Sequence, residues 1–215
     1  MKLKICGMRE CINVSEVAAL KPDYMGFIFY PESSRFVGDM AYDIISSVKK
    51  QGIEPVAVFV NASMETMIRT KIRYGFTYIQ LHGDETPQTC EVLRAKGFKV
   101  IKAFKVADSS DLKKTTAYEN CCDYFLFDTK TALFGGSGRH FDWDLLKGYS
   151  GTKPFFLSGG IGVDDVEKIR AFYHPMLLGI DLNSRFETGP ALKDVGLLKY
   201  FMNQLMIKNE NQYAK

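Results

Sequence analysis

LKICGM, residues 3–8, begins with an apolar run and stops at a thiol, Cys6, where Gly7 can turn the chain. Short runs of this kind, rich in β-branched and aromatic residues, recur along the sequence and predict β-strands. Working outward from the first, we expect eight strands: LKIC at 3–6, YMGFIF at 24–29, PVAVFV at 55–60, YIQL at 78–81, KVIKAF at 99–104, YFLFD at 124–128, PFFLS at 154–158 and LLGIDL at 177–182.

Between the strands, apolar residues fall three and four apart, the spacing of an amphipathic helix. A strand followed by a helix, eight times, with strands that are apolar on both faces, predicts an α/β fold of the (β/α)8 TIM-barrel type. The alternative is an open doubly wound sheet, whose Gly-rich fingerprint should follow the first strand, whereas Gly7 stands alone there. We expect a single domain over residues 1–215, with 208–215 as a frayed tail. The clearest helical segments are ECINVSEVAAL at 10–20, SMETMIRTKIRYG at 63–75 and GVDDVEKIRAF at 162–172.

Composition limits the classes of function. A chain of 215 residues, 46% of them hydrophobic, can bury one sizeable core. The net charge of +3 comes from scattered basic residues, which argues against a nucleic-acid partner and favours a small anionic ligand. No window approaches 18 uncharged apolar residues, so we expect neither secretion nor a membrane span. Five cysteines without zinc-like spacing predict reduced thiols in the cytoplasm rather than disulfides.

In a (β/α)8 barrel the active site is built at the carboxyl ends of the strands and in the loops after them. This rule converts the predicted fold into a short set of polar or reactive residues at those positions: Cys6, Arg35, Asn61, His82, Asp128, Ser158, Gly159, Gly160, Asp181, Asn183, Ser184 and Arg185.

The roles of three of these residues stay open on local sequence alone. Cys6 is either a small buried hydrophobe or a reagent. Asp128 caps a helix or pairs with Lys130, unless a desolvated site raises its pKa and lets it act as a general acid. His82 is a ligand, an acid or base, or a satisfied structural residue. We expect no metal, because the other histidines lie elsewhere in the predicted fold.

Two Gly-rich stretches also allow two interpretations each. SGGIG, residues 158–162, precedes a helix and suits a phosphate site, because barrels often bind phosphate after strands seven and eight. A plain tight turn is the alternative. FGGSGRHFDW, residues 134–143, is either a flap over the site or an ordinary loop ending at a helix cap, Asp142.

In this order and spacing, the motifs resemble the phosphoribosylanthranilate isomerase family of tryptophan biosynthesis nearly from end to end. The matching segments are KICG at 4–7, GFIFYPESSRFV at 26–37, VAVFVN at 56–61, IQLHGDE at 79–85, FLFDTK at 125–130, GGSGRHFDW at 135–143, SGGI at 158–161 and KD at 193–194.

The resemblance implies a barrel that rearranges N-(5-phosphoribosyl)anthranilate to 1-(2-carboxyphenylamino)-1-deoxyribulose 5-phosphate without a metal or organic cofactor. It implies that Cys6 is the general base and Asp128 the general acid, and that Arg35 holds the anthranilate end. His82 and Asp181 are implied to line the pocket. The implied phosphate loops contain Gly159, Gly160, Asn183, Ser184 and Arg185. We expect a monomer or homodimer.

One segment departs from the family pattern. DLNSRFETG, residues 181–189, has Asn183 and Arg185 where the family usually has a serine and a glycine. Since a side chain disfavours positive φ, we expect a reshaped phosphate cradle there or a charged contact from Arg185. The chemistry also requires a low pKa at Cys6 and a raised pKa at Asp128. A nearby cation or helix N-terminus could serve the first need, and apolar walls such as Phe127 and Phe125 could serve the second, although one of those two must face outward.

Two other functions remain as alternatives. The same barrel and phosphate site could serve another sugar-phosphate isomerase or epimerase, although Cys6 fits neither the two-aspartate design nor the metal-dependent one. The second alternative is a non-catalytic barrel that binds a phosphate ligand, a function that would not need both Cys6 and Asp128.

Overall fold

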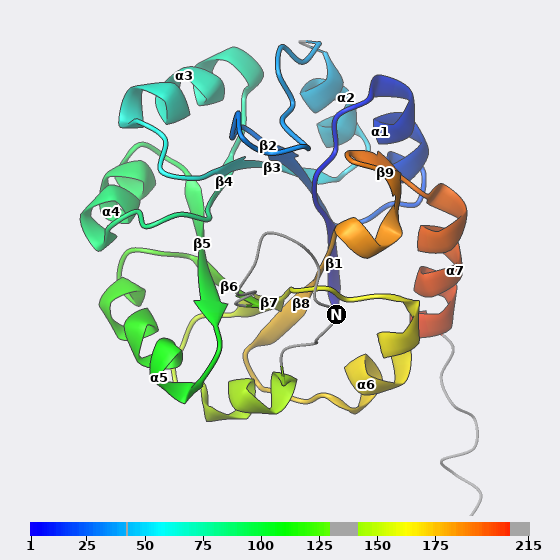
Figure 1. The fold of residues 1–215 in the computed structure, drawn as a ribbon. Coiled ribbons are helices and arrows are strands. Elements are labelled where there is room, and N and C mark those ends of the chain that lie inside the picture. The colour runs from blue at the N-terminus through cyan, green and yellow to red at the C-terminus, as the bar shows by residue number, and fades with distance from the viewer. Residues whose placement is uncertain (42, 130–141, 207–215) are drawn as a thin grey trace, which may run out of the picture.

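The computed structural model of the protein describes residues 1–41, 43–129 and 142–206. Eight parallel strands close into a barrel in sequence order, with β1 paired to both β2 and β8 (Figure 1). The predicted (β/α)8 fold is therefore confirmed. The strands are β1 (Lys2–Ile5), β2 (Tyr24–Ile28), β3 (Glu54–Phe59), β4 (Tyr78–Leu81), β5 (Lys99–Val106), β6 (Tyr124–Thr129), β7 (Phe155–Leu157) and β8 (Leu177–Leu182).

The helices surround the barrel on its outside (Figure 1). None of the helices within the described ranges is long and apolar enough to cross a membrane. The α-helices are α1 (Cys11–Ala18), α2 (Ile44–Lys50), α3 (Met64–Tyr74), α4 (Pro87–Ala95), α5 (Ser109–Leu112), α6 (Val166–Ala171) and α7 (Val195–Met206). The shorter elements are the 3-10 helices η1 (Lys113–Tyr118), η2 (Trp143–Gly148), η3 (Val163–Asp165) and η4 (Ser184–Phe186), and the two-stranded hairpin β9 (Glu187–Gly189) with β10 (Leu192–Lys193).

Local sequence explains where the best-formed helices begin and end. The Ser63 side chain accepts a hydrogen bond from the Thr66 amide at the start of α3, and Gly75, at φ 75°, ends that helix in the left-handed region. Thr86 caps α4 in the same way, and Pro87 occupies its first turn, where the missing N–H costs nothing. Such caps fix the helix ends and hence the lengths of the loops above the barrel.

The helix expected after the sixth strand is different from the prediction. The described residues there form only the 3-10 helix η2, because the segment is short and Gly148 ends it. Asp142 does act as a cap, accepting a hydrogen bond from the Asp144 amide at 3.1 Å. Residues 134–141 of the predicted flap lie outside the described residues, as does the predicted tail at 208–215.

The barrel interior changes character from one end to the other. At the amino ends of the strands an aromatic plug fills it, with Tyr24 packed edge-on against both Tyr78 and Phe156. At the carboxyl ends the inward side chains become polar. The plug closes the barrel at the amino ends of the strands, so a ligand enters at the polar carboxyl ends.

Candidate active site

A pocket of about 180 Å³ lies at the carboxyl ends of the strands. It brings together most of the residues singled out from the sequence, although they are far apart along the chain. The residues that line it are Cys6, Ile28, Val58, Gln80, His82, Asp128, Ser158, Gly159, Gly160, Ile161, Asp181, Asn183 and Ser184.

Cys6 lies just past the end of β1 and is 4% exposed. Its space is provided by the neighbouring strand, because a Cβ placed on Gly26 would come within 2.6 Å of the thiol sulfur. Glycine at position 26 of β2 thus lets the thiol lie against that strand's backbone while it still lines the pocket.

A buried ion pair lies beside the thiol. Lys4, two residues before Cys6 on β1, donates from Nζ to Asp181 Oδ1 at 2.7 Å, and Ser158 donates to the other oxygen of Asp181 at 3.2 Å. Both members of the pair are buried. Asp181 therefore meets the pocket as a charged and already hydrogen-bonded group rather than as a free carboxylate.

The pKa of Cys6 differs from the expectation. Burial raises the pKa of the thiol above its ordinary value, and the Asp181 carboxylate acts in the same direction, while the ammonium groups of Lys4 and Lys193 oppose the rise. The predicted cations are present, but desolvation outweighs them, so the free protein favours the thiol form.

Asp128 lines the pocket from β6 and lies 3.2 Å from Nε2 of His82, measured to Oδ2. The other ring nitrogen of His82 accepts a hydrogen bond of 2.9 Å from the Gln80 amide. Gln80 is 1% exposed, and its Oε1 has no hydrogen-bond partner in the part of the chain that the structure describes. Gln80, His82 and Asp128 thus form a chain of polar contacts across the pocket wall.

The expectation that Phe125 and Phe127 form apolar walls for Asp128 is wrong. Alternate residues of a strand face opposite sides, and Leu126 belongs with Cys6 in the barrel interior. Phe125 and Phe127 instead face the helices, where both pack against Tyr149. Asp128 shares the inward side with Leu126, so its surroundings are set by His82 and the pocket.

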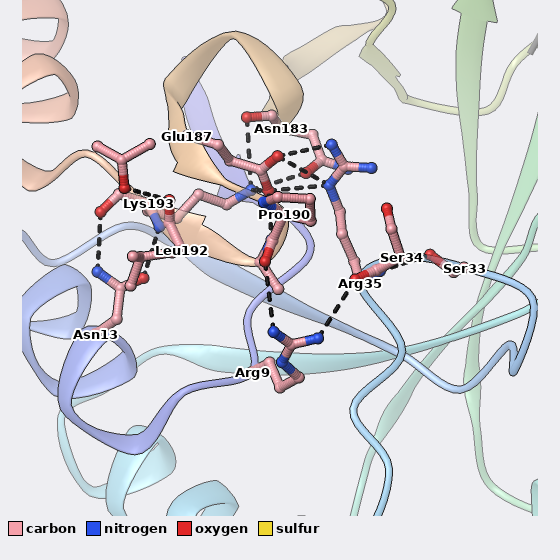
Figure 2. Close-up of polar contacts among 12 residues, drawn as sticks. Arg9, Asn13, Ser33, Ser34, Arg35, Asn183, Glu187, Pro190, Leu192 and Lys193 are labelled. Carbon is pink, nitrogen blue, oxygen red and sulfur yellow. Dashed lines mark hydrogen bonds and ion pairs between the residues drawn. The ribbon is translucent and has the colours of Figure 1, made fainter. Parts of the chain in front are cut away.

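Arg35 lies beside the pocket rather than among its lining residues. Its guanidinium makes a two-pronged contact with Glu187 of β9, in which Nη2 donates at 2.6 Å and Nε at 2.9 Å (Figure 2). Lys193 of β10 donates to the same carboxylate at 2.6 Å and to Asn183 Oδ1 at 2.7 Å. Burial opposes ionisation of Glu187, yet the hydrogen bonds from Arg35 and Lys193 hold the pKa of this carboxyl below its ordinary value.

The two loops implied in phosphate binding lie together at the pocket. Gly159 and Gly160 have φ values of 96° and 68°, which favour glycine. The anticipated strain at Asn183 and Arg185 does not arise, because Asn183 has a φ of −146° and Arg185 has no positive φ. Arg185 is exposed and its guanidinium lies near Gly162, which places a positive charge beside the loop after β7.

Four polar residues near the pocket were not singled out from the sequence: Lys4, Gln80, Glu187 and Lys193. Alternation could have found two of them, since Lys4 and Gln80 each precede a predicted site residue by two positions on a strand and share its face. Lys193 belongs to the KD match at 193–194, to which the resemblance gave no role, and Glu187 carries no signal of either kind. Both reach the site through the β9–β10 hairpin.

The chain is similar to known proteins over nearly its whole length. The family model described as "N-(5'phosphoribosyl)anthranilate (PRA) isomerase" matches residues 3–204. N-(5'-phosphoribosyl)anthranilate isomerases from Parabacteroides distasonis and Phocaeicola vulgatus are 48% and 44% identical, over 96% and 97% of this chain and 94% and 99% of theirs.

Solved structures are similar over the same range. The phosphoribosyl anthranilate isomerase of Thermotoga maritima has a TM-score of 0.82 at 29% identity, covering 95% of this chain and 98% of that one. Another isomerase structure, solved with reduced 1-(o-carboxyphenylamino)-1-deoxyribulose 5-phosphate, has a TM-score of 0.79 at 25% identity and the same coverage. The chain belongs to the N-(5'-phosphoribosyl)anthranilate isomerase family.

Proposed function

We propose that this chain isomerises N-(5-phosphoribosyl)anthranilate to 1-(2-carboxyphenylamino)-1-deoxyribulose 5-phosphate, an Amadori rearrangement of tryptophan biosynthesis. The observation that carries the proposal is one pocket lined by a thiol, Cys6, and a carboxyl group, Asp128, together with residues of the loops after β7 and β8, the first of which contributes Gly159 and Gly160. The reaction needs one acid, one base and a phosphate site, and this pocket offers a candidate for each.

Asp128 is the general acid of the first step. In its protonated form it gives its proton to the ring oxygen of the ribose, the sugar opens, and the amine nitrogen becomes an iminium. His82, 3.2 Å from the carboxyl oxygen, holds Asp128 in position. The positive iminium acidifies the hydrogen on the neighbouring C2 carbon, which prepares the second step.

Cys6 is the general base of that second step. Its thiolate removes the C2 proton and leaves a neutral enolamine. The enolamine relaxes to the ketone as its C2 hydroxyl proton passes to the Asp128 carboxylate and the Cys6 thiol returns a proton to C1, so that both groups recover their starting forms. The ammonium groups of Lys4 and Lys193 stabilise the thiolate against the raised pKa that burial imposes. The barrel interior thus supplies charge where the sequence alone offered only a cysteine.

The ends of the substrate have separate places. Backbone N–H groups at Gly159, Gly160 and Ser184 hold the phosphate, and Arg185 adds a charge at the rim. Asn183 contributes through its backbone, since its side chain is engaged with Lys193. Arg35 contacts the anthranilate carboxylate with the edge of its guanidinium that Glu187 does not use.

The test follows the loss of anthranilate-type fluorescence when purified protein meets freshly generated substrate. We expect turnover that a chelator does not reduce, and a kcat about 10²- to 10⁴-fold lower in Cys6→Ala and in Asp128→Asn, the usual worth of one general acid or base. Cys11→Ser is the matched control, because Cys11 is an exposed thiol on α1.

Three outcomes would redirect the proposal. Turnover within a few-fold of wild type in either pocket variant would remove that residue from the mechanism. Loss of activity on chelation would point to a metal-dependent epimerase on the same barrel. Ligand binding without turnover would point to a non-catalytic barrel.

A further inference from the structure

Three cysteine thiols gather away from the active site, between α4 and the turn that precedes β6. The sulfur atoms of Cys90, Cys121 and Cys122 all lie within 4.8 Å of one another. Cys121 and Cys122 are adjacent, and on a strand they would face opposite sides. They lie instead at a turn, which allows both thiols to meet Cys90 from α4.

The cluster is buried and its thiols are free. Cys90 and Cys122 are 0% exposed and Cys121 is 7% exposed, all within the apolar layer between barrel and helices. The Cys121 thiol donates to the Tyr118 carbonyl at 3.5 Å, which orients it. One buried cysteine is an ordinary core residue, but three thiols converging from two separate segments make a ligand set.

The spacing is close to what a metal ion needs. Metal–thiolate bonds are about 2.3 Å long, so three sulfurs arranged in a triangle around one ion lie about 4 Å apart. Sulfurs already within 4.8 Å of one another are close to that spacing.

We propose that Cys90, Cys121 and Cys122 form a three-coordinate site for a soft, monovalent cation, copper(I). An all-sulfur set selects soft ions. Structural zinc takes four ligands, and among the described residues no fourth His, Cys, Asp or Glu joins this group.

Loading of copper(I) is balanced by the release of protons from the thiols. Copper remains in the +1 state, and each cysteine that binds as a thiolate releases one proton to the solvent. The Lys102 ammonium, 5.9 Å from the ring centroid of Tyr118, is paired with the Glu85 carboxylate at 3.3 Å, so the two form an ion pair rather than a free positive charge on this side of the barrel. None of the three cysteines lines the active-site pocket, so isomerase activity serves as an independent check that a variant has folded.

The experiment is an anaerobic titration of the reduced chain with copper(I) against a competing chromophoric chelator. We expect one copper(I) per chain. Affinity should fall roughly 100-fold or more in Cys90→Ala and in Cys122→Ala, each of which removes one ligand. Cys11→Ser and Cys6→Ala remove thiols outside the cluster and should leave the copper affinity unchanged.

X-ray absorption of the copper-loaded wild-type chain gives a second readout that needs no variant to fold. Three sulfur neighbours at about 2.3 Å would support the site. Binding that is lost with Cys6 or Cys11 but kept in Cys90→Ala would overturn it. So would a copper shell dominated by nitrogen or oxygen, or oxidation to a Cys90–Cys122 disulfide with no copper retained.

Discussion

The thiol of Cys6 lies between opposing influences. The apolar interior and the Asp181 carboxylate favour the neutral thiol, whereas the ammonium groups of Lys4 and Lys193 favour the thiolate. Lys193 is itself held in a buried network, and burial lowers its pKa although Glu187 opposes that change. The reactivity of one residue therefore depends on charges from two elements far apart in the sequence.

Alkylation by iodoacetamide in the Cys11→Ser background measures this balance. Because only the thiolate reacts, the rate at Cys6 should rise about tenfold per pH unit and keep rising beyond pH 9.0, its ordinary pKa. Lys193→Gln should raise the pKa further and slow alkylation several-fold at pH 8, whereas Lys199→Gln, an exposed lysine, should not. Peptide mapping by mass spectrometry assigns the site. An alkylation rate of Cys6 that stopped rising below pH 8 would contradict the raised pKa of this thiol.

Gln80 controls which nitrogen of His82 carries the proton. With the amide donating to Nδ1, the proton is on Nε2 and points to Asp128. Rotating the amide by 180° would place Oε1, now unpartnered among the described residues, against a protonated Nδ1 and let Nε2 accept a hydrogen bond from protonated Asp128. In the proposed mechanism Asp128 passes through both protonation states, and Gln80 can match either of them.

Gln80→Leu removes this match, and because Gln80 also lines the pocket, KM reports separately on any loss of binding. We expect kcat to fall about tenfold, a fraction of the ~10²- to 10⁴-fold worth of a general acid, with KM within about twofold of wild type. Steady-state kinetics on the fluorescent substrate provides the measurement. Gln51→Leu, at an exposed helix end, is the control. A raised KM at constant kcat would instead make Gln80 a binding residue.

At the scale of elements, the β9–β10 hairpin fastens the site to the first helix. Lys193 exchanges two hydrogen bonds with Asn13 of α1, at 2.7 Å and 2.9 Å, while its ammonium reaches Glu187 (Figure 2). Arg9 adds a contact from the loop after β1 to the carbonyl of Pro190. A short hairpin thus joins the loops after the first, second and eighth strands.

Glu187→Gln tests the hairpin as a structural unit. The change leaves Arg35 and Lys193 facing each other without the carboxylate, so the free energy of unfolding should fall by about 3 kcal/mol in urea denaturation at pH 7. Asp144→Asn, which breaks the exposed pair with Lys147, should cost less than about 1 kcal/mol. Equal losses of unfolding free energy in the two variants would show that Glu187 stabilises the protein no more than an exposed ion pair does.

The pH dependence of that difference has a definite sign. The folded protein depresses the pKa of Glu187, so its contribution is present above the ordinary value of 4.5 and is lost as pH falls through the folded pKa. The gap between wild type and Glu187→Gln should therefore narrow on acidification below pH 4.5. A gap that stayed constant would show that the carboxylate's charge is not its cause.

Particular elements show how far sequence reasoning reaches. YIQL at 78–81 and LLGIDL at 177–182 match β4 and β8 residue for residue, because short apolar runs between turn residues are a local property. The convergence of Cys6 and Asp128 follows from the barrel rule. The sign of the Cys6 pKa shift does not, because it depends on burial and on Asp181, which is distant in sequence. The cysteine cluster could not be predicted for the same reason, because Cys90 lies far from Cys121 and Cys122 in the sequence.

At the scale of the whole molecule, closure leaves each barrel strand hydrogen-bonded to two neighbours. The pocket needs this arrangement, because its lining residues are spread along the chain from Cys6 to Ser184. The aromatic plug at the amino ends of the strands and the helices outside the barrel pack against the same strands. We infer that the described residues unfold as one cooperative unit, as expected of a single domain.

The single tryptophan provides the test. Trp143 is 0% exposed and packs against Phe172, with the Lys168 ammonium 4.4 Å from its ring, so its emission reports the side of the barrel near α6. Far-UV circular dichroism reports all helices and strands together. In urea we expect the two signals to change at the same midpoint with the same slope, because α6 cannot detach without exposing β7 and β8. Fluorescence that changed at clearly lower urea would divide the chain into separately unfolding parts.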